Sequence, residues 1–101
     1  MTRKEVINIL EDASKKGIFH KHKGGMNIFY RSKPFCIIAG TSSIYFIVQP
    51  FMCVAGGIRT IIGNLNSNYD DIKNINIISN KEIHITLNCG AVFSMHDKME
   101  Y

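Results

Sequence analysis

Hydrophobic residues at the start of the chain recur at the spacing of an α-helix. Residues three and four positions apart lie on the same side of a helix, so this pattern would give the segment one apolar side. Thr2 followed by Glu5 is the capping-box pattern that begins helices, and Gly17 is typical of a helix end. The pattern therefore predicts a helix over residues 3–16. The recurring apolar residues are Val6, Ile9, Leu10 and Ala13.

Short runs of β-branched and aromatic residues follow, and glycine, serine or proline separates one run from the next. Runs that are apolar on both faces are typical of strands covered on both sides of a sheet. Gly24-Gly25 tolerates the positive φ of a tight turn and predicts a hairpin, and residues 40–42 predict a second turn. The predicted strands are residues 18–22, 26–31, 35–39 and 43–49.

The uncharged stretch from Pro34 to Ile58 raises the alternative of a membrane span, because about 20 apolar residues cross a bilayer as a helix. Prolines, glycines and small polar residues divide the stretch into pieces of about five to seven residues, which is the usual length of a strand. We therefore interpret the stretch as strands of a sheet and expect no membrane partner.

Helical spacing returns after this stretch. Four apolar residues follow the pattern i, i+3, i+4 and i+7, which predicts a second, short helix. The next residues are mostly polar, so residues 64–71 are expected to form a loop. The four apolar residues are Ile58, Ile61, Ile62 and Leu65.

The last third of the chain alternates apolar and other residues without a slip for thirteen residues from Ile83 onward. A two-residue turn inside this segment need not preserve the alternation, so the pattern predicts one long strand with a bend or bulge at Gly90. The preceding strand, residues 74–78, is expected to return through a three-residue loop at residues 79–81. A loop of that length pairs Ile77 with Ile83 on the same face.

Together these elements predict an α+β fold with a mainly antiparallel sheet of about six strands and a long bent C-terminal strand. A chain of 101 residues has room for one core, so residues 1–101 are expected to form a single domain. So small a domain has little material to cover a strand that is apolar on both faces, such as residues 44–48. We therefore expect a homodimer or a higher oligomer.

Cysteine content and the first residues indicate a cytoplasmic protein. Three cysteines without Cys-x-x-Cys spacing are typical of reduced thiols, not of a disulfide framework or a zinc ribbon. Charged residues occupy the positions where a signal peptide has an unbroken apolar run, so we expect the cytoplasm of a bacterium or of an infected host cell. The cysteines are Cys36, Cys53 and Cys89.

Positive charge is concentrated near the start of the chain. The first 35 residues contain eight lysines or arginines against three acids, whereas the other 66 residues contain four against five. Phe19, Phe29 and Tyr30 lie among these cations, as stacking groups do on surfaces that bind single-stranded nucleic acid. This pattern favours contact with a phosphate backbone or an acidic protein, and the alternative is an ordinary solvated face. The residues predicted to bind a partner or nucleic acid are Lys15, Lys16, Lys21, Lys23, Arg31 and Lys33.

The polar side of the last predicted strand offers a second candidate site. Neutral donors and acceptors on one face could orient a small ligand in a pocket. The alternative, which we favour, is the solvent-facing side of a sheet. The residues of this candidate site are His84, Thr86, Asn88, Ser94 and His96.

No catalytic constellation is recognisable, and no cofactor is expected. A cysteine nucleophile needs a base within hydrogen-bond reach, but Cys89 and His84 are five residues apart and would lie on opposite faces of the predicted strand. His20 and His22 would share one face of a strand and could begin a metal site, yet no third ligand can be assigned, so no metal is predicted. We therefore expect a protein that is not an enzyme.

The leading hypothesis is a small non-enzymatic binding protein that acts by occupying the surface of a partner. Such proteins include phage or mobile-element inhibitors of a host defence or nucleic-acid-processing complex, and the AT-rich codon usage implied by abundant Ile, Asn and Lys fits that origin. The second hypothesis is direct binding of nucleic acid by the basic N-terminal third. The third is a nucleotide or metabolite binder, or an enzyme, built on the polar face of the last strand.

Overall fold

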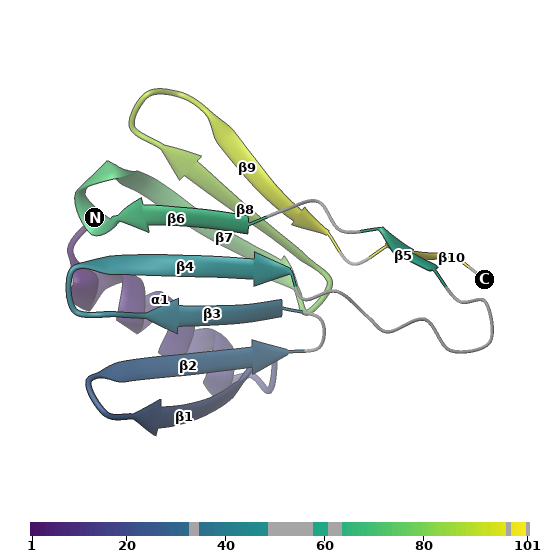
Figure 1. Ribbon diagram of the computed structural model, residues 1–101, viewed down its shortest axis with the longest axis horizontal. Coiled ribbons are helices and arrows are strands. Elements are labelled where there is room, and N and C mark those ends of the chain that lie inside the picture. The colour runs from purple at the N-terminus through teal and green to yellow at the C-terminus, as the bar shows by residue number, and fades with distance from the viewer. Residues whose placement is uncertain (33–34, 49–57, 61–63, 97, 101) are drawn as a thin grey trace.

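The computed structural model describes residues 1–32, 35–48, 58–60, 64–96 and 98–100 (Figure 1). These residues form one α-helix, one 3₁₀ turn and ten strands. The α+β class and the helix near the start of the chain are thus confirmed, and the strands outnumber the six that were predicted. The elements are α1 (Arg3–Lys15), β1 (His20–Gly24), β2 (Asn27–Ser32), β3 (Phe35–Ala39), β4 (Ser43–Val48), β5 (Ile58–Thr60), β6 (Asn64–Asn68), η1 (Tyr69–Asp71), β7 (Ile72–Ser79), β8 (Glu82–Leu87), β9 (Val92–His96) and β10 (Lys98–Glu100).

The helix begins and ends as its local sequence predicts. The Thr2 hydroxyl accepts a hydrogen bond from the Glu5 backbone N–H at 3.2 Å, and the Glu5 carboxylate accepts one from the Thr2 N–H at 3.0 Å. This reciprocal pair is the capping box. At the other end, Gly17 adopts φ +81°, and it and Ile18 donate back to the carbonyls of the last turn, which is the Schellman arrangement.

The described strands form three antiparallel sheets. The largest has the order β1-β2-β3-β4-β6, a second has the order β7-β8-β9, and β5 pairs with β10. The first four predicted strands are present, although β1 starts two residues later than expected. The β1–β2 turn accordingly consists of Gly25 and Met26, with Gly25 at φ +64°, and not of Gly24-Gly25.

The second helix and the polar loop after it were wrong predictions. Ile58 belongs to the short strand β5, and residues 64–68 form β6, which pairs with β4 at the edge of the large sheet. In β6 the exposed asparagines alternate with the more buried Leu65 and Ser67, as the period of a strand requires. Pairing with β4 is a tertiary contact that the local spacing does not encode. Ile61 and Ile62 lie outside the described residues.

The single long C-terminal strand was also wrong, because the chain reverses and forms the hairpin β8–β9. The register pairs Ile85 with Phe93, and the Leu87 N–H donates to the Ala91 carbonyl at 2.8 Å. The loop between Leu87 and Ala91 therefore has three residues, 88–90. A loop with an odd number of residues keeps the apolar residues of both strands on the same face, so the alternation continues through the turn. Gly90 adopts φ +94° in this turn, as three-residue hairpin loops require near their end.

The hairpin between β7 and β8 has the predicted register. Ile77 pairs with Ile83, and Ile75 pairs with Ile85. Ser79 pairs with Glu82, so Ile78 has no partner on β8. This unpaired residue lies in an irregularity between Ile77 and Ser79, and not in the turn itself. The predicted register is therefore correct, but the predicted three-residue loop is wrong: the turn consists of Asn80 and Lys81, and the irregularity at Ile78 restores the pairing.

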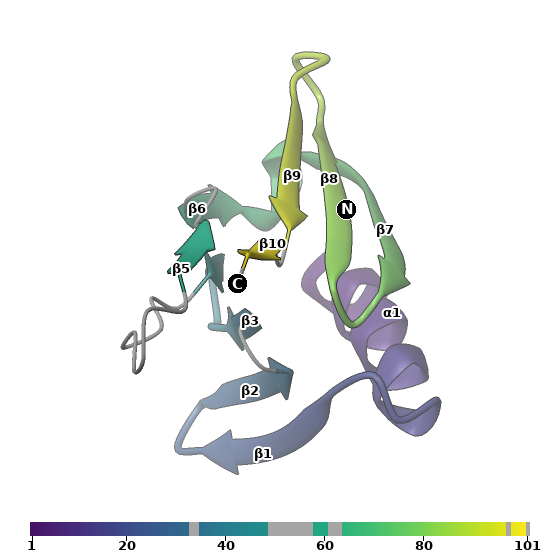
Figure 2. The same cartoon turned by 90° about the vertical axis from the view of Figure 1, so that its right-hand side faces the viewer.

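The core lies between the large sheet, α1 and the β7-β8-β9 sheet. Figure 2 shows α1 and the smaller sheet on the same side of the large sheet, and one cluster of buried side chains joins the three. We call the side of the large sheet toward this core its inner face and the opposite side its outer face. The buried apolar residues are Val6, Leu10, Ala13, Phe19, Tyr30, Phe35, Ile37, Ala39, Ile44, Phe46, Tyr69, Ile72, Ile75, Ile83, Ile85 and Met95.

The stretch that raised the question of a membrane span contributes β3 and β4, and residues 49–57 lie outside the described part of the chain. Among the described residues, no helix has both the length and the hydrophobicity needed to cross a membrane. The interpretation of residues 35–48 as strands is confirmed.

One backbone group connects the helix, the β3–β4 turn and η1. The Gly40 carbonyl accepts hydrogen bonds from Arg3 Nε at 2.8 Å and from the hydroxyl of the buried Tyr69. Gly40 also donates through its N–H to the Ser43 carbonyl at 3.0 Å. A Cβ atom at residue 40 would lie 2.9 Å from that carbonyl oxygen, so only glycine fits without a backbone shift.

We expect Gly40→Ala to lower the free energy of unfolding by about 1–3 kcal/mol, the usual cost of overpacking a tight site. The new methyl group must displace the Ser43 carbonyl and with it the bonds to Gly40. Urea denaturation followed by circular dichroism measures the change. Ser42→Ala, at an exposed position of the same turn, is the matched control and should change stability by less than about 0.5 kcal/mol. Equal stability of the two variants would show that the close contact is not rigid.

Candidate functional site

The basic residues predicted to bind a partner are divided between two faces of the large sheet. Lys21 pairs with Tyr30 across β1 and β2, and Tyr30 points inward to the core, so Lys21 and Lys23 lie on the inner side at the β1 edge. Arg31 follows Tyr30 and therefore lies on the outer face. Lys15 and Lys16 are at the end of α1, and Lys33 lies outside the described residues.

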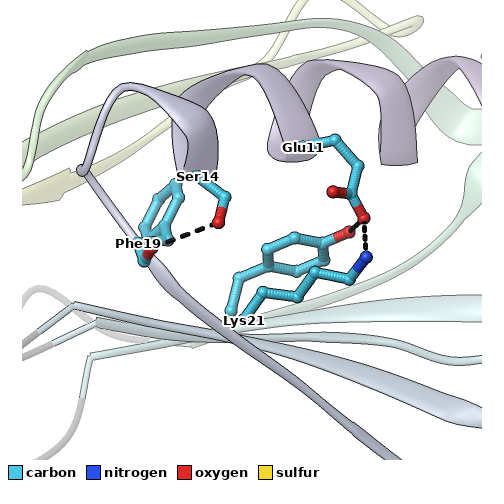
Figure 3. Close-up of polar contacts among 5 residues, drawn as sticks. Glu11, Ser14, Phe19 and Lys21 are labelled. Carbon is cyan, nitrogen blue, oxygen red and sulfur yellow. Dashed lines mark hydrogen bonds and ion pairs between the residues drawn. The ribbon is translucent and has the colours of Figure 1, made fainter.

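Two of these lysines form ion pairs with carboxylates of α1, and Figure 3 shows one of them, between Lys21 and Glu11. Lys16 Nζ lies 3.3 Å from Asp12 Oδ2, one helical turn away. Lys21 pairs with Glu11, which also accepts a hydrogen bond of 3.0 Å from the buried Tyr30 hydroxyl. The Lys21 ammonium and the Tyr30 hydroxyl hold the pKa of Glu11 below its ordinary value. These contacts attach α1 to β1 and β2, and they neutralise part of the predicted basic patch.

Two of the three aromatic residues predicted as stacking groups belong to the core. Phe19 and Tyr30 are buried and contact each other edge to face, with ring centroids 6.4 Å apart. Burial, followed by the hydrogen bond to Glu11, raises the pKa of Tyr30. Neither ring is available to a ligand. Phe29 alone of the three lies on the outer face, where the alternation of β2 places it.

The outer face carries two rows of side chains that run across all five strands of the large sheet. The strand registers define both rows, and the residues that alternate with them on β2, β3, β4 and β6 point toward the inner face. The first row contains aromatic and imidazole rings, and the second contains a cation at the β1–β2 end. In the order β1-β2-β3-β4-β6, the first row is His22, Phe29, Ile38, Tyr45 and Asn66, and the second is His20, Arg31, Cys36, Ile47 and Asn64.

The Phe29 ring is held in place at the β1 end of the first row. The His22 ring stacks on it, with centroids 4.8 Å apart and an interplanar angle of 6°. Arg31 Cζ lies 5.8 Å from the Phe29 centroid, within the range of a cation–π contact. A Cβ atom on Gly24 would lie 2.9 Å from Phe29 Cε2, so the glycine leaves the space that the ring occupies. Phe29 thus orients both His22 and Arg31.

Exposure and charge set this face apart from an ordinary sheet surface. Tyr45 is 40 % exposed, and His20, His22 and Arg31 are also exposed, whereas Cys36 in the second row is buried. The acids whose side chains are described lie elsewhere, on α1, η1 and β8, so the described part of the outer face carries no carboxylate. The outer face therefore combines exposed rings with positive charge.

The second predicted site is the solvent-facing side of the small sheet. His84 pairs with Ser94, and the His84 ring contacts the Glu82 carboxylate at 2.6 Å. Thr86 lies on the same side, and the neighbouring Val92 is 59 % exposed. His96 continues the strand opposite Glu82, with its side chain outside the described parts. This surface is a half-exposed sheet face.

Asn88 does not belong to that surface and has a structural role instead. Its side-chain Nδ2 donates to the Asp70 carbonyl at 2.6 Å, and its backbone N–H donates to the Asp71 carbonyl at 2.9 Å. The β8–β9 turn is thereby attached to η1. A groove of about 470 Å³ lies beside this turn, lined by β6, Asp71, Asn88 and Cys89, and it contains none of the other four predicted ligand-binding residues.

The described residues contain no group of three or more side chains placed to ligate a metal. His20 and His22 share the outer face, as expected, with no carboxylate or thiol of the described residues completing a site around them. Cys36 is buried, Cys89 is exposed in the β8–β9 turn, and Cys53 lies outside the described residues.

Sequence reasoning missed Tyr45 as a surface residue, because it lies in an apolar run that was interpreted as covered on both sides. The signal was available in the alternation itself, since Ile44 and Phe46 are the inward pair and Tyr45 points the other way. The prediction of an oligomer stays a prediction.

We expect Tyr30→Phe to lower the free energy of unfolding by about 1–2 kcal/mol at pH 7, because it removes a hydrogen bond to a charged group. The pKa of Glu11 is lowered in the folded state, so this contribution is complete above the ordinary value of 4.5 and is lost as the pH falls through the lowered value. The difference between wild type and variant should therefore shrink from pH 7 toward pH 3. Denaturant unfolding at several pH values measures it.

The matched control is Tyr45→Phe, which removes a hydroxyl from the exposed tyrosine of the outer face. This change should alter stability by less than about 0.5 kcal/mol at every pH. If Tyr30→Phe behaves like Tyr45→Phe, the contact with Glu11 does not stabilise the attachment of the helix.

No protein-family model, curated protein or solved structure matched the chain.

Proposed function

We propose that this protein is a non-enzymatic binding protein that contacts its partner with the outer face of the large sheet. The observation that supports this proposal is the exposed Tyr45, which lies in one row with Phe29 and next to a row that contains Arg31. Tyrosine and arginine are among the residues that contribute most to binding interfaces. An antiparallel sheet with one wet face usually carries polar residues there, so exposed rings need another explanation.

The outer face is favoured over the basic end predicted from the sequence. Lys16 and Lys21 already have carboxylate partners on α1, which weakens their attraction for an anionic surface. Arg31, by contrast, lies on a face without a described carboxylate, and its partner is the Phe29 ring. The positive charge of Arg31 is therefore more available to a partner than the charges of Lys16 and Lys21.

Binding by occupation of a surface requires shape and charge but no reactive group. A partner covered in this way loses access to its own ligands, which is how a small protein can inhibit a larger complex. We propose this mode of action, with inhibition of a host defence or nucleic-acid-processing complex by a phage or mobile-element protein as its specific form. The abundance of Ile, Asn and Lys, which is expected of an AT-rich genome, supports the specific form, and the exposed rings support the mode.

The proposal predicts that the double variant Arg31→Glu/Tyr45→Ser loses its partner. Removing interface residues of these types typically costs about 2 kcal/mol or more, which corresponds to roughly a 30-fold loss of affinity. The tagged protein is used as bait in a lysate of its source cells, with and without nuclease, and captured material is quantified by mass spectrometry. Circular dichroism confirms that the variant is folded.

The matched control is Lys15→Glu/Lys23→Glu, which reverses two charges of the basic end and leaves the outer face unchanged. It should retain most of the captured partner. Loss of the partner in this control, with retention in Arg31→Glu/Tyr45→Ser, would place the binding surface at the basic end and reject the outer face.

A further inference from the structure

The two aromatic rings of the outer face are spaced for separate stacked units: Tyr45 is 40 % exposed, and the half-buried Phe29 carries the exposed His22 ring on top of it. Phe29 is on β2 and Tyr45 is on β4, with Ile38 of β3 between them. Neighbouring strands are about 4.8 Å apart, so the two backbones that carry the rings are separated by about 10 Å. Tyr45 can therefore receive one planar ligand group, and the exposed His22 ring, which covers Phe29, can receive a second, with the aliphatic Ile38 between them.

Charge on the outer face is complementary to a phosphate backbone. Arg31 is exposed beside the row of rings, and His20 pairs with it across β1 and β2. A guanidinium group binds phosphate oxygens through two parallel hydrogen bonds, and the Phe29 ring at 5.8 Å orients this one. The described residues of the face include no carboxylate that would repel an anion.

Neutral hydrogen-bonding groups lie at the other end of the same rows. Asn66 pairs with Tyr45, and Asn68 pairs with Ser43, so both asparagines lie on the outer side of β6 and both are exposed. An amide carries two donors and one acceptor group, the set needed to bind the edge of a nucleobase. The face thus offers imidazole rings on β1, Arg31 and Phe29 on β2, Tyr45 on β4 and amides on β6.

From these three features we infer that the partner is single-stranded nucleic acid, and this inference rests on the proposed binding role of the outer face. Bases stack on Tyr45 and on the exposed His22 ring that covers Phe29, phosphates contact Arg31, and base edges reach the asparagines of β6. Stacking of successive bases on aromatic side chains along a cationic surface is the general chemistry of single-strand binding.

A double helix does not fit this surface. Its bases are stacked on one another and offer only their edges, which proteins reach with a helix or a two-stranded ribbon inserted in a groove. The rings of the outer face lie on an open sheet and need bases that are free to unstack. Discrimination between single and double strands therefore tests the role of the rings, because phosphate contacts alone would bind both.

The test is fluorescence anisotropy with labelled 12-nucleotide oligo(U), oligo(dT) and a 12-base-pair duplex, measured over a series of salt concentrations. We expect wild type to bind at least one single strand roughly tenfold more tightly than the duplex. Tyr45→Leu removes the ring but keeps an apolar side chain, and it should weaken single-strand binding by roughly tenfold. Tyr45→Phe keeps the ring and should bind like wild type.

A second pair of variants isolates the phosphate contact. Arg31→Gln should reduce the slope of log affinity against log salt by about 0.7, the value for one phosphate of a single strand. Lys23→Gln also removes one positive charge but lies on the inner side of β1, so it should leave the slope nearly unchanged. Thermal unfolding of each variant shows whether a loss of binding reflects a loss of folding.

Three results would overturn the inference: no saturable binding of either single strand at low salt, equal binding of duplex and single strand, or wild-type affinity in Tyr45→Leu. If the oligonucleotides fail to bind but Arg31→Glu/Tyr45→Ser still loses a nuclease-resistant partner, the partner is a protein and the proposed function stands. If they fail and light scattering shows a dimer that Tyr45→Leu converts to a monomer, a second copy covers the face. If neither partner nor self-association depends on these residues, both proposals are rejected.

Discussion

Packing of both α1 and the β7-β8-β9 sheet on one face of the five-stranded sheet is the constraint on which the rest of the described structure depends. Both α1 and the β7-β8-β9 sheet pack on the inner face, where Tyr30, Ile37 and Phe46 are fully buried. Side chains alternate along a strand, so burying these positions forces Phe29 and Tyr45 to the other side. A shift of register by one residue would exchange the two sets and expose the core. The same packing that stabilises the fold therefore fixes the composition of the outer face.

The β1 strand is not held in place by burial in the core, because all of its residues are exposed. Its position rests on pairing with β2 and on the contact between Lys21 and Glu11 of α1. Lysines and histidines on a free edge also discourage pairing with another sheet. Part of the positive charge near the start of the chain is thus explained by folding and by protection of an edge. Arg31 on the outer face is not explained by either cause.

The elements that the sequence predicts correctly are those with local signals. The capping box and Gly17 define α1, short apolar runs between turn residues define β2 to β4, and the glycine turn after β1 defines the first hairpin. The failures have tertiary causes. β6 is a strand because β4 provides its partner, and the β8–β9 hairpin was hidden because a three-residue turn preserves the alternation. For the site, the sequence located Phe29 and Arg31 in a basic region, but only the register shows that they share a face with Tyr45.

The uneven exposure of the outer face bears on what can bind there. Cys36 is 3 % exposed and Ile47 is partly covered, whereas Tyr45 is 40 % exposed, so the open area is a narrow row and not the whole sheet. A stable protein interface buries about 800 Å² on each partner, which requires contacts well beyond one row of side chains. A stacked base, in contrast, needs little more than the face of one ring and contributes roughly 1–3 kcal/mol. A few bases aligned across the strands would therefore cover the exposed rings while leaving the buried residues of the second row undisturbed.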